Sequence, residues 1–350
     1  MVKTEAVKAG YEIKEVLKNW QTIVKEYQTP NTQKAIIQIL NSFIPFMAIW
    51  ALMYWSLDYS YWLVVGLSVL NAFFLVRIFI IQHDCGHQSF LKSRKWNNAI
   101  GFICSFISLI PYKYWARSHD FHHAHNGQLE TRDIGDLDFF TVEEYKALSK
   151  KKQFYYRVYR NPFVLFVIIP VYYLLIHNRI PLIKMKGWGA ARRSLQWSNL
   201  WIFLFYGVLF YIFGWKEFLL VQAPISFFFA ITAIWFFYVQ HQHEESYKEW
   251  KENWEYLFSA IRGSTYYKLP KVMQWLTGNI GYHHIHHLSS KIPNYNLEKC
   301  NKENPIFERY ATTLTFFQSL KTIFNTLWDE EQQRMISFSE FYKMEKQVAC

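Results

Sequence analysis

Long stretches without charge alternate along this chain with stretches crowded with charge. The four longest uncharged or nearly uncharged stretches cover residues 35–57, 61–81, 197–215 and 218–239. Each is long enough to cross a hydrocarbon core of roughly 30 Å as a helix that rises about 1.5 Å per residue. Only residues 58–60 separate the first two stretches, and only residues 216–217 separate the last two. The pattern therefore predicts two transmembrane helical hairpins with four spans.

Two shorter apolar stretches are harder to assign. Residues 99–110 are too short to cross a membrane. Residues 163–183 contain Pro170 and have basic residues on both sides, whereas a crossing helix usually has one basic flank. We expect both stretches to re-enter the membrane or to lie at its surface, and a crossing by residues 163–183 stays an alternative.

The basic residues indicate the orientation. The chain carries 38 Lys+Arg against 27 Asp+Glu, and most of the positive charge lies outside the two hairpin turns. Because basic loops stay in the cytosol, we expect both termini and the loops that carry the basic residues to be cytosolic. The predicted organisation is a cytosolic segment over residues 1–34, a membrane domain over 35–297 and a cytosolic helical segment over 298–350. A polar helix over residues 142–156 is expected in the same cytosolic cap.

The composition excludes two other classes of protein. Aromatic residues make up 20% of the chain, which excludes an intrinsically disordered protein. Four cysteines in 350 residues exclude a small disulfide scaffold. The predicted fold class is therefore an all-α integral membrane protein with a helical cap.

Histidines form the chemical signal of the sequence. Of 13 histidines, twelve lie in four short clusters next to the predicted spans. The clusters are HDCGH with His83 and His87, HDFHHAH with His119, His122, His123 and His125, QHQHE with His241 and His243, and HHIHH with His283, His284, His286 and His287. On a helix, residues three or four apart share a face, so each cluster can direct two or three imidazoles at one point. Two spans precede the first cluster and two lie between the second and the fourth, which brings all four to one face of the membrane.

This spacing favours metal binding over isolated buried histidines. A single histidine whose ring bonds a backbone carbonyl is the ordinary interpretation for His177, which stands alone. Eight or nine imidazoles are too many for one ion and suit two, and neutral ligands with open positions suit O2 activation by iron. Asp84, Asp120 and Glu244 each follow a histidine directly, so they are expected to accept hydrogen bonds from imidazole N–H groups or to be solvated carboxylates.

At this point a family resemblance is clear. HDCGH, HDFHH and HHIHH resemble the three histidine boxes of the membrane-bound fatty acid desaturases, and QHQHE resembles their additional histidine position. The runs WARSHDFHHAHNG and GYHHIHHLSSKIPNYNL are most similar to bacterial acyl-lipid desaturases of the Δ5 and Δ12 (ω-6) types. The resemblance implies a non-haem di-iron centre with nine ligands, namely His83, His87, His119, His122, His123, His241, His283, His286 and His287. It favours His241 over His243 as the ninth ligand, with His243 in a supporting role beside it.

The resemblance implies an enzyme that uses O2 to introduce a C=C bond into lipid acyl chains, with its site facing the cytosol from a bacterial cytoplasmic membrane. The sequence carries no cytochrome b5 motif, no dinucleotide-binding motif and no cysteine set for an iron–sulfur cluster. We therefore expect a separate electron donor, an acidic ferredoxin or flavodoxin that the basic cap could bind. Attraction of the basic cap to anionic lipid is the other explanation of its charge. We expect no nucleic-acid partner. The alternatives are a hydroxylase or epoxygenase on the same centre, and a membrane metal-binding or transport protein.

Overall fold

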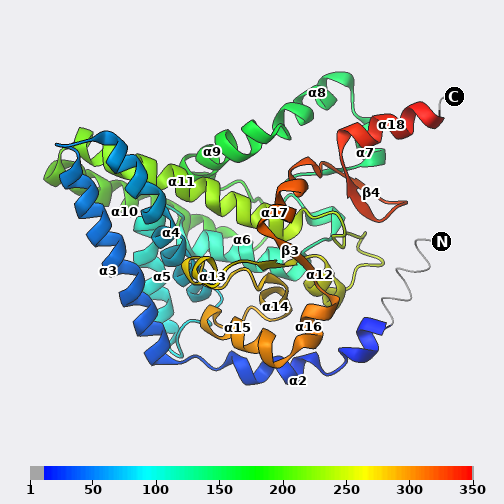
Figure 1. Cartoon of the computed structure of the whole chain (residues 1–350), viewed down its shortest axis with the longest axis horizontal. Coiled ribbons are helices and arrows are strands. Elements are labelled where there is room, and N and C mark those ends of the chain that lie inside the picture. The colour runs from blue at the N-terminus through cyan, green and yellow to red at the C-terminus, as the bar shows by residue number, and fades with distance from the viewer. Residues whose placement is uncertain (1–11, 349–350) are drawn as a thin grey trace.

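Four long helices dominate the computed structural model, which describes residues 12–348. They are α3 (Thr32–Ser56), α4 (Tyr61–Gly86), α10 (Gly189–Phe213) and α11 (Trp215–His241). All four are long and apolar enough to cross a membrane, and they gather at one end of the molecule (Figure 1). This confirms the predicted pair of helical hairpins and the membrane fold class.

The turn of the second hairpin differs from the prediction. Lys216 and Glu217 do not separate the helices but lie in the first turn of α11. The break falls at Gly214, whose φ of 79° is a conformation that side-chain-bearing residues rarely adopt. Glu217 then lies at the start of a helix, where the helix dipole stabilises a negative charge.

Two further helical segments are sharply bent. α5 (Arg94–Ser108) and α6 (Tyr112–His125) meet at 101°, and α8 (Lys150–Tyr159) meets the stretch Val164–Arg179 at 57°. That stretch consists of the π-helix η3 (Val164–Ile168), α9 (Ile169–Leu175) and the 3-10 turn η4 (His177–Arg179). Each bent pair has the shape of a broken span or a re-entrant loop.

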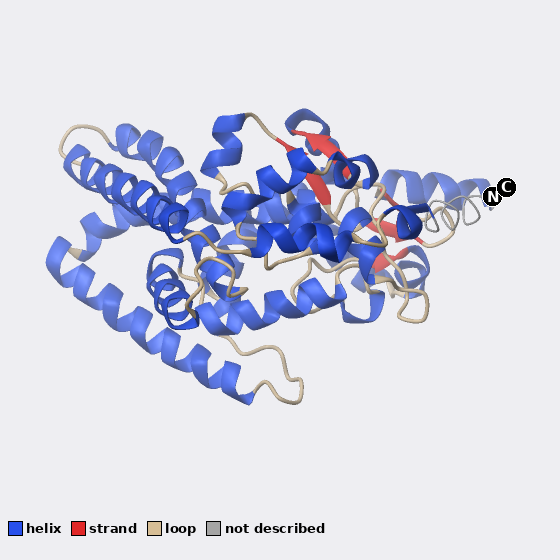
Figure 2. Ribbon diagram, turned by 90° about the horizontal axis from the view of Figure 1, so that it is seen from below, coloured by secondary structure: helices blue, strands red, loops and turns tan. Residues whose placement is uncertain are grey.

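The cap is mainly helical, as predicted, and it also contains short strands that the sequence did not predict. β1 (Phe140–Thr141), β4 (Leu327–Asp329) and β5 (Arg334–Ile336) form one sheet, in which Phe140 pairs with Leu327 in a parallel ladder. β2 (Thr265–Lys268) and β3 (Thr312–Thr315) form a second, parallel pair. In Figure 2 the strands lie in the middle and in the right-hand part of the view, and β2 contacts α11. Such short strands leave too little alternation in a sequence to be recognised.

Short helices complete the cap. The polar helix expected over residues 142–156 is interrupted: α7 (Val142–Ala147) ends before Ser149, whose side chain caps α8. The remaining elements are α2 (Trp20–Lys25), η1 (Glu26–Gln28), η2 (Leu129–Thr131), α12 (Tyr256–Arg262), α13 (Lys271–Leu276), α14 (His283–Leu288), α15 (Asn294–Glu303), α16 (Pro305–Tyr310), α17 (Phe316–Ser319), η5 (Leu320–Phe324) and α18 (Phe338–Val348).

Arg77 links the cap to the membrane helices. Its guanidinium is buried in α4, where Nε donates to Ser42 Oγ at 3.2 Å and Nη2 donates to Asn41 Oδ1 at 2.9 Å. Nη1 donates to the backbone carbonyl of Trp275, and the guanidinium lies 3.8 Å from the centroid of the Trp275 ring. The one charged residue of the predicted spans therefore fastens α13 to the first hairpin, just before the chain enters α14.

Candidate metal centre

Two groups of histidines converge between the long helices and the cap. In the first group, the ligand nitrogens of five histidines all lie within 4.8 Å of one another. Its members are His83, His87, His119, His123 and His286. The second group brings together His122, His241 and His287 within the same limit. His283 adjoins this second group, because its Nε2 lies 2.9 Å from Nε2 of His241 and 3.1 Å from Nε2 of His287.

Helix geometry distributes the rings between the two groups. The apolar helix α4 extends to Gly86, so His83 and His87 project from the end of a membrane helix. On α6, His119 and His123 are four residues apart and their Nε2 atoms lie 3.1 Å apart, whereas His122 turns to the second group. α14 likewise divides its histidines between the two groups. The structure thus brings together the nine histidines that the resemblance nominates.

Hydrogen bonds orient several of these rings. His83 Nδ1 donates to Asp84 Oδ1 and His87 Nδ1 donates to Asp120 Oδ1, both at 2.9 Å. His241 Nδ1 donates to the carbonyl of Gly263 at 3.1 Å. A proton held on Nδ1 leaves the lone pair of Nε2 free to bind a metal ion.

The donor set fits metal ions. Nε2 of His83, Nε2 of His87 and both ring nitrogens of His286 are buried without a hydrogen-bond partner among residues 12–348. Burial, followed by the neighbouring imidazoles, lowers the pKa of His286 and of His287 well below the ordinary 6.5. Neutral imidazoles with unused lone pairs are ligands for Fe, Zn, Cu or Ni, and two groups of this size fit two ions.

Asp84 does more than orient His83. Its carboxylate is 1% exposed, and its second oxygen accepts hydrogen bonds from Asn294 N at 2.6 Å and from Asn294 Nδ2 at 2.7 Å. Asn294 is the first residue of α15, where a negative charge is favoured by the helix dipole. One buried carboxylate therefore connects the histidines of α4 to the cap.

Other candidate residues lie apart from the two groups. His243 is 1% exposed, but neither of its ring nitrogens has a hydrogen-bond partner in the described chain and it joins neither group. The side chain of Glu244 is 63% exposed and pairs with Arg334 at 3.3 Å, rather than with an imidazole. His125 bonds the carbonyl of Phe121 at 2.9 Å, and His284 is buried beside Tyr266.

His177 differs from its expected role. It stacks on Tyr173 with ring centroids 4.5 Å apart. Its Nδ1 is buried with no hydrogen-bond partner within residues 12–348, so it is not the carbonyl-bonded histidine that the sequence predicted.

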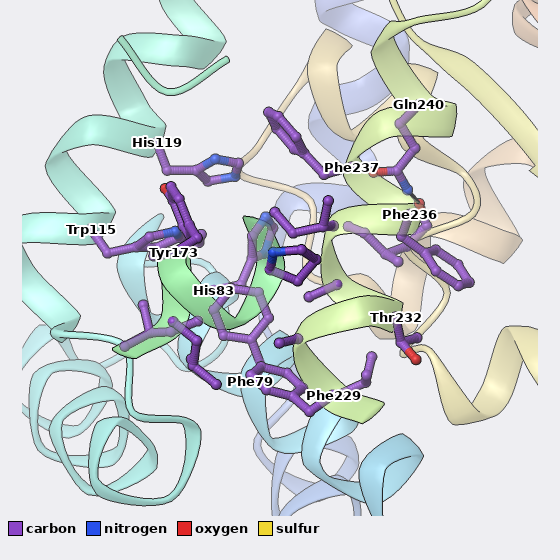
Figure 3. A pocket seen from close by; sticks show the side chains of 18 of the residues that line it. Phe79, His83, Trp115, His119, Tyr173, Phe229, Thr232, Phe236, Phe237 and Gln240 are labelled. Carbon is purple, nitrogen blue, oxygen red and sulfur yellow. Dashed lines mark hydrogen bonds between the residues drawn. The ribbon is translucent and has the colours of Figure 1, made fainter. Parts of the chain in front are cut away.

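A cavity of about 150 Å³ opens beside the first group. His83 and His119 reach it from α4 and α6, and His283 lines it as well (Figure 3). The rest of its wall is mostly apolar, with aromatic rings contributed by Phe79, Trp115, Tyr173, Phe229, Phe236 and Phe237. An apolar space next to a polar centre suits an alkyl chain.

One buried cation near the centre gave no signal in the sequence. Lys248 is 1% exposed, its Nζ donates to the carbonyl of His241 at 3.2 Å, and Nζ lies 4.3 Å from the centroid of the Phe139 ring. Burial lowers the pKa of Lys248 to about 8. A cation at the C-terminal end of α11 is stabilised by the helix dipole and fixes the turn that carries His241. In the sequence, this lysine lies in a polar run that is typical of an exposed loop.

Comparison with known proteins identifies relatives that match this chain over most of its length. A family model described as "Fatty acid desaturase" matches residues 60–318. A fatty acid desaturase of Bacillus subtilis is 46% identical over 90% of this chain and 89% of its own length. An sn-1 oleoyl-lipid 12-desaturase of Anabaena variabilis is 25% identical over 85% of this chain and 82% of its own length. An sn-1 acyl-lipid omega-3 desaturase (ferredoxin) of Synechocystis sp. is 29% identical, covering 73% of this chain and 70% of that protein.

Proposed function

Because the chain belongs to the fatty acid desaturase family, we propose that it uses O2 to introduce a C=C bond into the acyl chains of membrane lipids at a non-haem di-iron centre. The observation that carries this proposal is the pair of converging imidazole groups beside an apolar cavity. The lipid-bound substrate is supported by the relatives of Anabaena and Synechocystis, which are named as an oleoyl-lipid and an acyl-lipid desaturase.

We assign the metal ligands to the two groups as they converge. One iron would be held by the first group of five histidines. The other would be held by His122, His241, His283 and His287. The choice of His241 over His243 is supported by the 2.9 Å and 3.2 Å separations that its Nε2 makes with His283 and His122. Asp84 and Asp120 would keep the protons of His83 and His87 on Nδ1.

The protein contributes position and exclusion of water. An unactivated methylene has no acidic proton, so bound iron and O2 would supply the oxidation that acid–base side chains cannot. The cavity lets a chain lie beside His83 and His119, with the aromatic walls at Trp115 and Phe237 limiting its path. The same apolar walls keep bulk water from the reacting carbons.

Electrons would come from a separate acidic protein, a ferredoxin or flavodoxin, on the cytosolic face of a bacterial cytoplasmic membrane. Two relatives, from Synechocystis and Nostoc, are named for ferredoxin, and this chain has a net charge of +11. Since screening limits electrostatic reach to about 8 Å at physiological salt, turnover with subsaturating acidic donor should slow as ionic strength rises. A rate that ignores salt would instead favour an uncharged donor such as a membrane quinol.

Expression in a host that lacks the product tests the reaction. Gas chromatography with mass spectrometry should show acyl chains that gain a C=C bond and no hydroxyl group. The matched control is the His119→Ala variant, which should yield no product. An acyl product that is heavier than its substrate by one oxygen would establish the hydroxylase or epoxygenase alternative and contradict the desaturase proposal.

A further inference from the structure

One wall of the cavity carries a polar group that the proposed chemistry does not use. Asn178, in η4, lines the cavity next to Tyr173 and Leu174. It is 6% exposed, and its Nδ2 has no hydrogen-bond partner among residues 12–348. A buried amide donor without a partner is unfavourable, because it has lost its water and gained nothing in return. The geometry therefore calls for an acceptor oxygen on the molecule that fills the cavity.

The next residue presents a second unused donor. Arg179 Nη1 donates to Asn199 Oδ1 at 3.1 Å, and Asn199 Nδ2 donates back to the carbonyl of Arg179 at 2.9 Å. This reciprocal pair fixes the guanidinium against α10. Nη2 of the same guanidinium is buried and has no partner in the described chain. A fixed guanidinium with a free N–H is suited to a phosphate oxygen.

Surrounding side chains place these two donors where protein meets the boundary of a bilayer. Ile176 and Ile180 on either side of η4 are 49% and 43% exposed, as expected for residues that contact lipid. On α10, Trp197 and Trp201 flank Asn199 and are 62% and 50% exposed. Exposed tryptophans concentrate at the level where hydrocarbon gives way to headgroups. Ester and phosphate oxygens of lipids lie at that level.

We propose that Asn178 and Arg179 bind the ester carbonyl and the phosphate of a glycerophospholipid whose acyl chain occupies the cavity. The proposal rests on the proposed function, which it deepens by naming the polar part of the substrate. Lys184 and Lys186, both exposed, follow in the chain and add attraction for an anionic headgroup. Asn178, Tyr173 and His83 all line the cavity, so an acyl chain held at Asn178 would be positioned at the histidines from its ester end rather than from its methyl end.

Three lipids separate the two contacts in the purified, iron-loaded protein. These are diacyl phosphatidylglycerol, its dialkyl ether analogue without ester carbonyls, and diacylglycerol without phosphate. The native protein should bind the first lipid more tightly than the other two. Asn178→Leu should weaken binding of the diacyl phospholipid about fivefold and leave the ether analogue unchanged. Arg179→Met should weaken binding of the phospholipid by at least about tenfold and leave diacylglycerol unchanged. The exposed Arg309→Met is the matched control and should bind all three lipids like the native protein.

Several results would overturn the site. Equal affinity of the native protein for the diacyl and dialkyl lipids would contradict the ester contact at Asn178. This result needs no variant, so it holds even if Asn178→Leu fails to fold. Displacement of the lipid by inorganic phosphate alone would identify a free-anion site instead. Desaturation of the same phospholipid by the native protein is measured in parallel. Product without lipid discrimination rejects this site alone, whereas an oxygenated product rejects the proposed function.

Discussion

Replacement of Asp84 by Asn gives a sharp test of how the first histidine group is held. Three donors converge on the Asp84 carboxylate, namely His83 Nδ1, Asn294 N and Asn294 Nδ2. Asn keeps the size of the side chain but offers one oxygen. Whichever way the amide is turned, its NH2 group faces either His83 or the two donors of Asn294. Asp84→Asn must therefore leave at least one buried hydrogen bond unmade.

The magnitude follows from that count. An unmade buried hydrogen bond lowers the free energy of unfolding by about 1–3 kcal/mol, and loss of a partner that orients a metal-bound histidine weakens metal affinity about 10- to 100-fold. Iron affinity is measured by competition with a chelator, and stability by thermal unfolding in detergent.

Asp120→Asn is the matched control: the Asp120 side chain is 57% exposed, so the amide can keep its oxygen on His87 and turn its NH2 to water. We expect less than about a tenfold loss of iron affinity there. Equal losses in the two variants, or native iron affinity in Asp84→Asn, would refute the reasoning.

Three further predictions follow from other parts of the structure. Arg77→Met leaves the carbonyl of Trp275 and two side-chain acceptors without this donor, so the free energy of unfolding should fall by about 1–3 kcal/mol; thermal unfolding measures it, with the exposed Arg94→Met expected to match the native protein. His241→Ala should remove about half of the bound iron and abolish turnover, whereas His243→Ala should retain iron, and iron analysis that gave the reverse order would exchange their roles. In metal-free protein, burial holds the pKa of His286 well below 6.5, so below that pH the unfolded chain binds more protons than the folded one. The melting temperature should therefore fall as the pH drops below about 6.5 and stay level above it, and a melting temperature that rises on acidification would contradict this.

Patterns that repeat along the chain were sufficient to predict much of the fold and of the centre. Long runs without charge defined α3, α4, α10 and α11, because a membrane requires apolar length whatever the tertiary contacts. The convergence of the histidines followed from two facts readable in sequence, helical spacing within each cluster and an even number of spans between clusters. The choice between His241 and His243 needed the resemblance, because His241 is the last residue of α11 and His243 follows only two residues later.

Features that depend on contacts between distant segments were not predictable. Asp84 and Asn294 are joined by two hydrogen bonds across 210 positions of sequence. Strand β1 pairs with β4, and both are too short to show the alternation of apolar and polar residues that predicts a strand. Lys248 lies in a polar run of the sequence, which is typical of an exposed loop, although its side chain is buried in the structure. The second hairpin breaks at Gly214, where the backbone has a positive φ that the sequence pattern does not show. The positions of the charged residues had instead predicted the break at Lys216 and Glu217.

The central claim is that two histidine groups hold two iron ions that act together in acyl desaturation. Titration of metal-free protein with Fe(II), with product measured at each point in the presence of phospholipid, O2 and an electron donor, tests it most directly. The account predicts little product up to about one iron per chain and a rise that saturates at about two, because both groups must be filled. Full turnover at one iron per chain, or product that does not depend on iron, would contradict it.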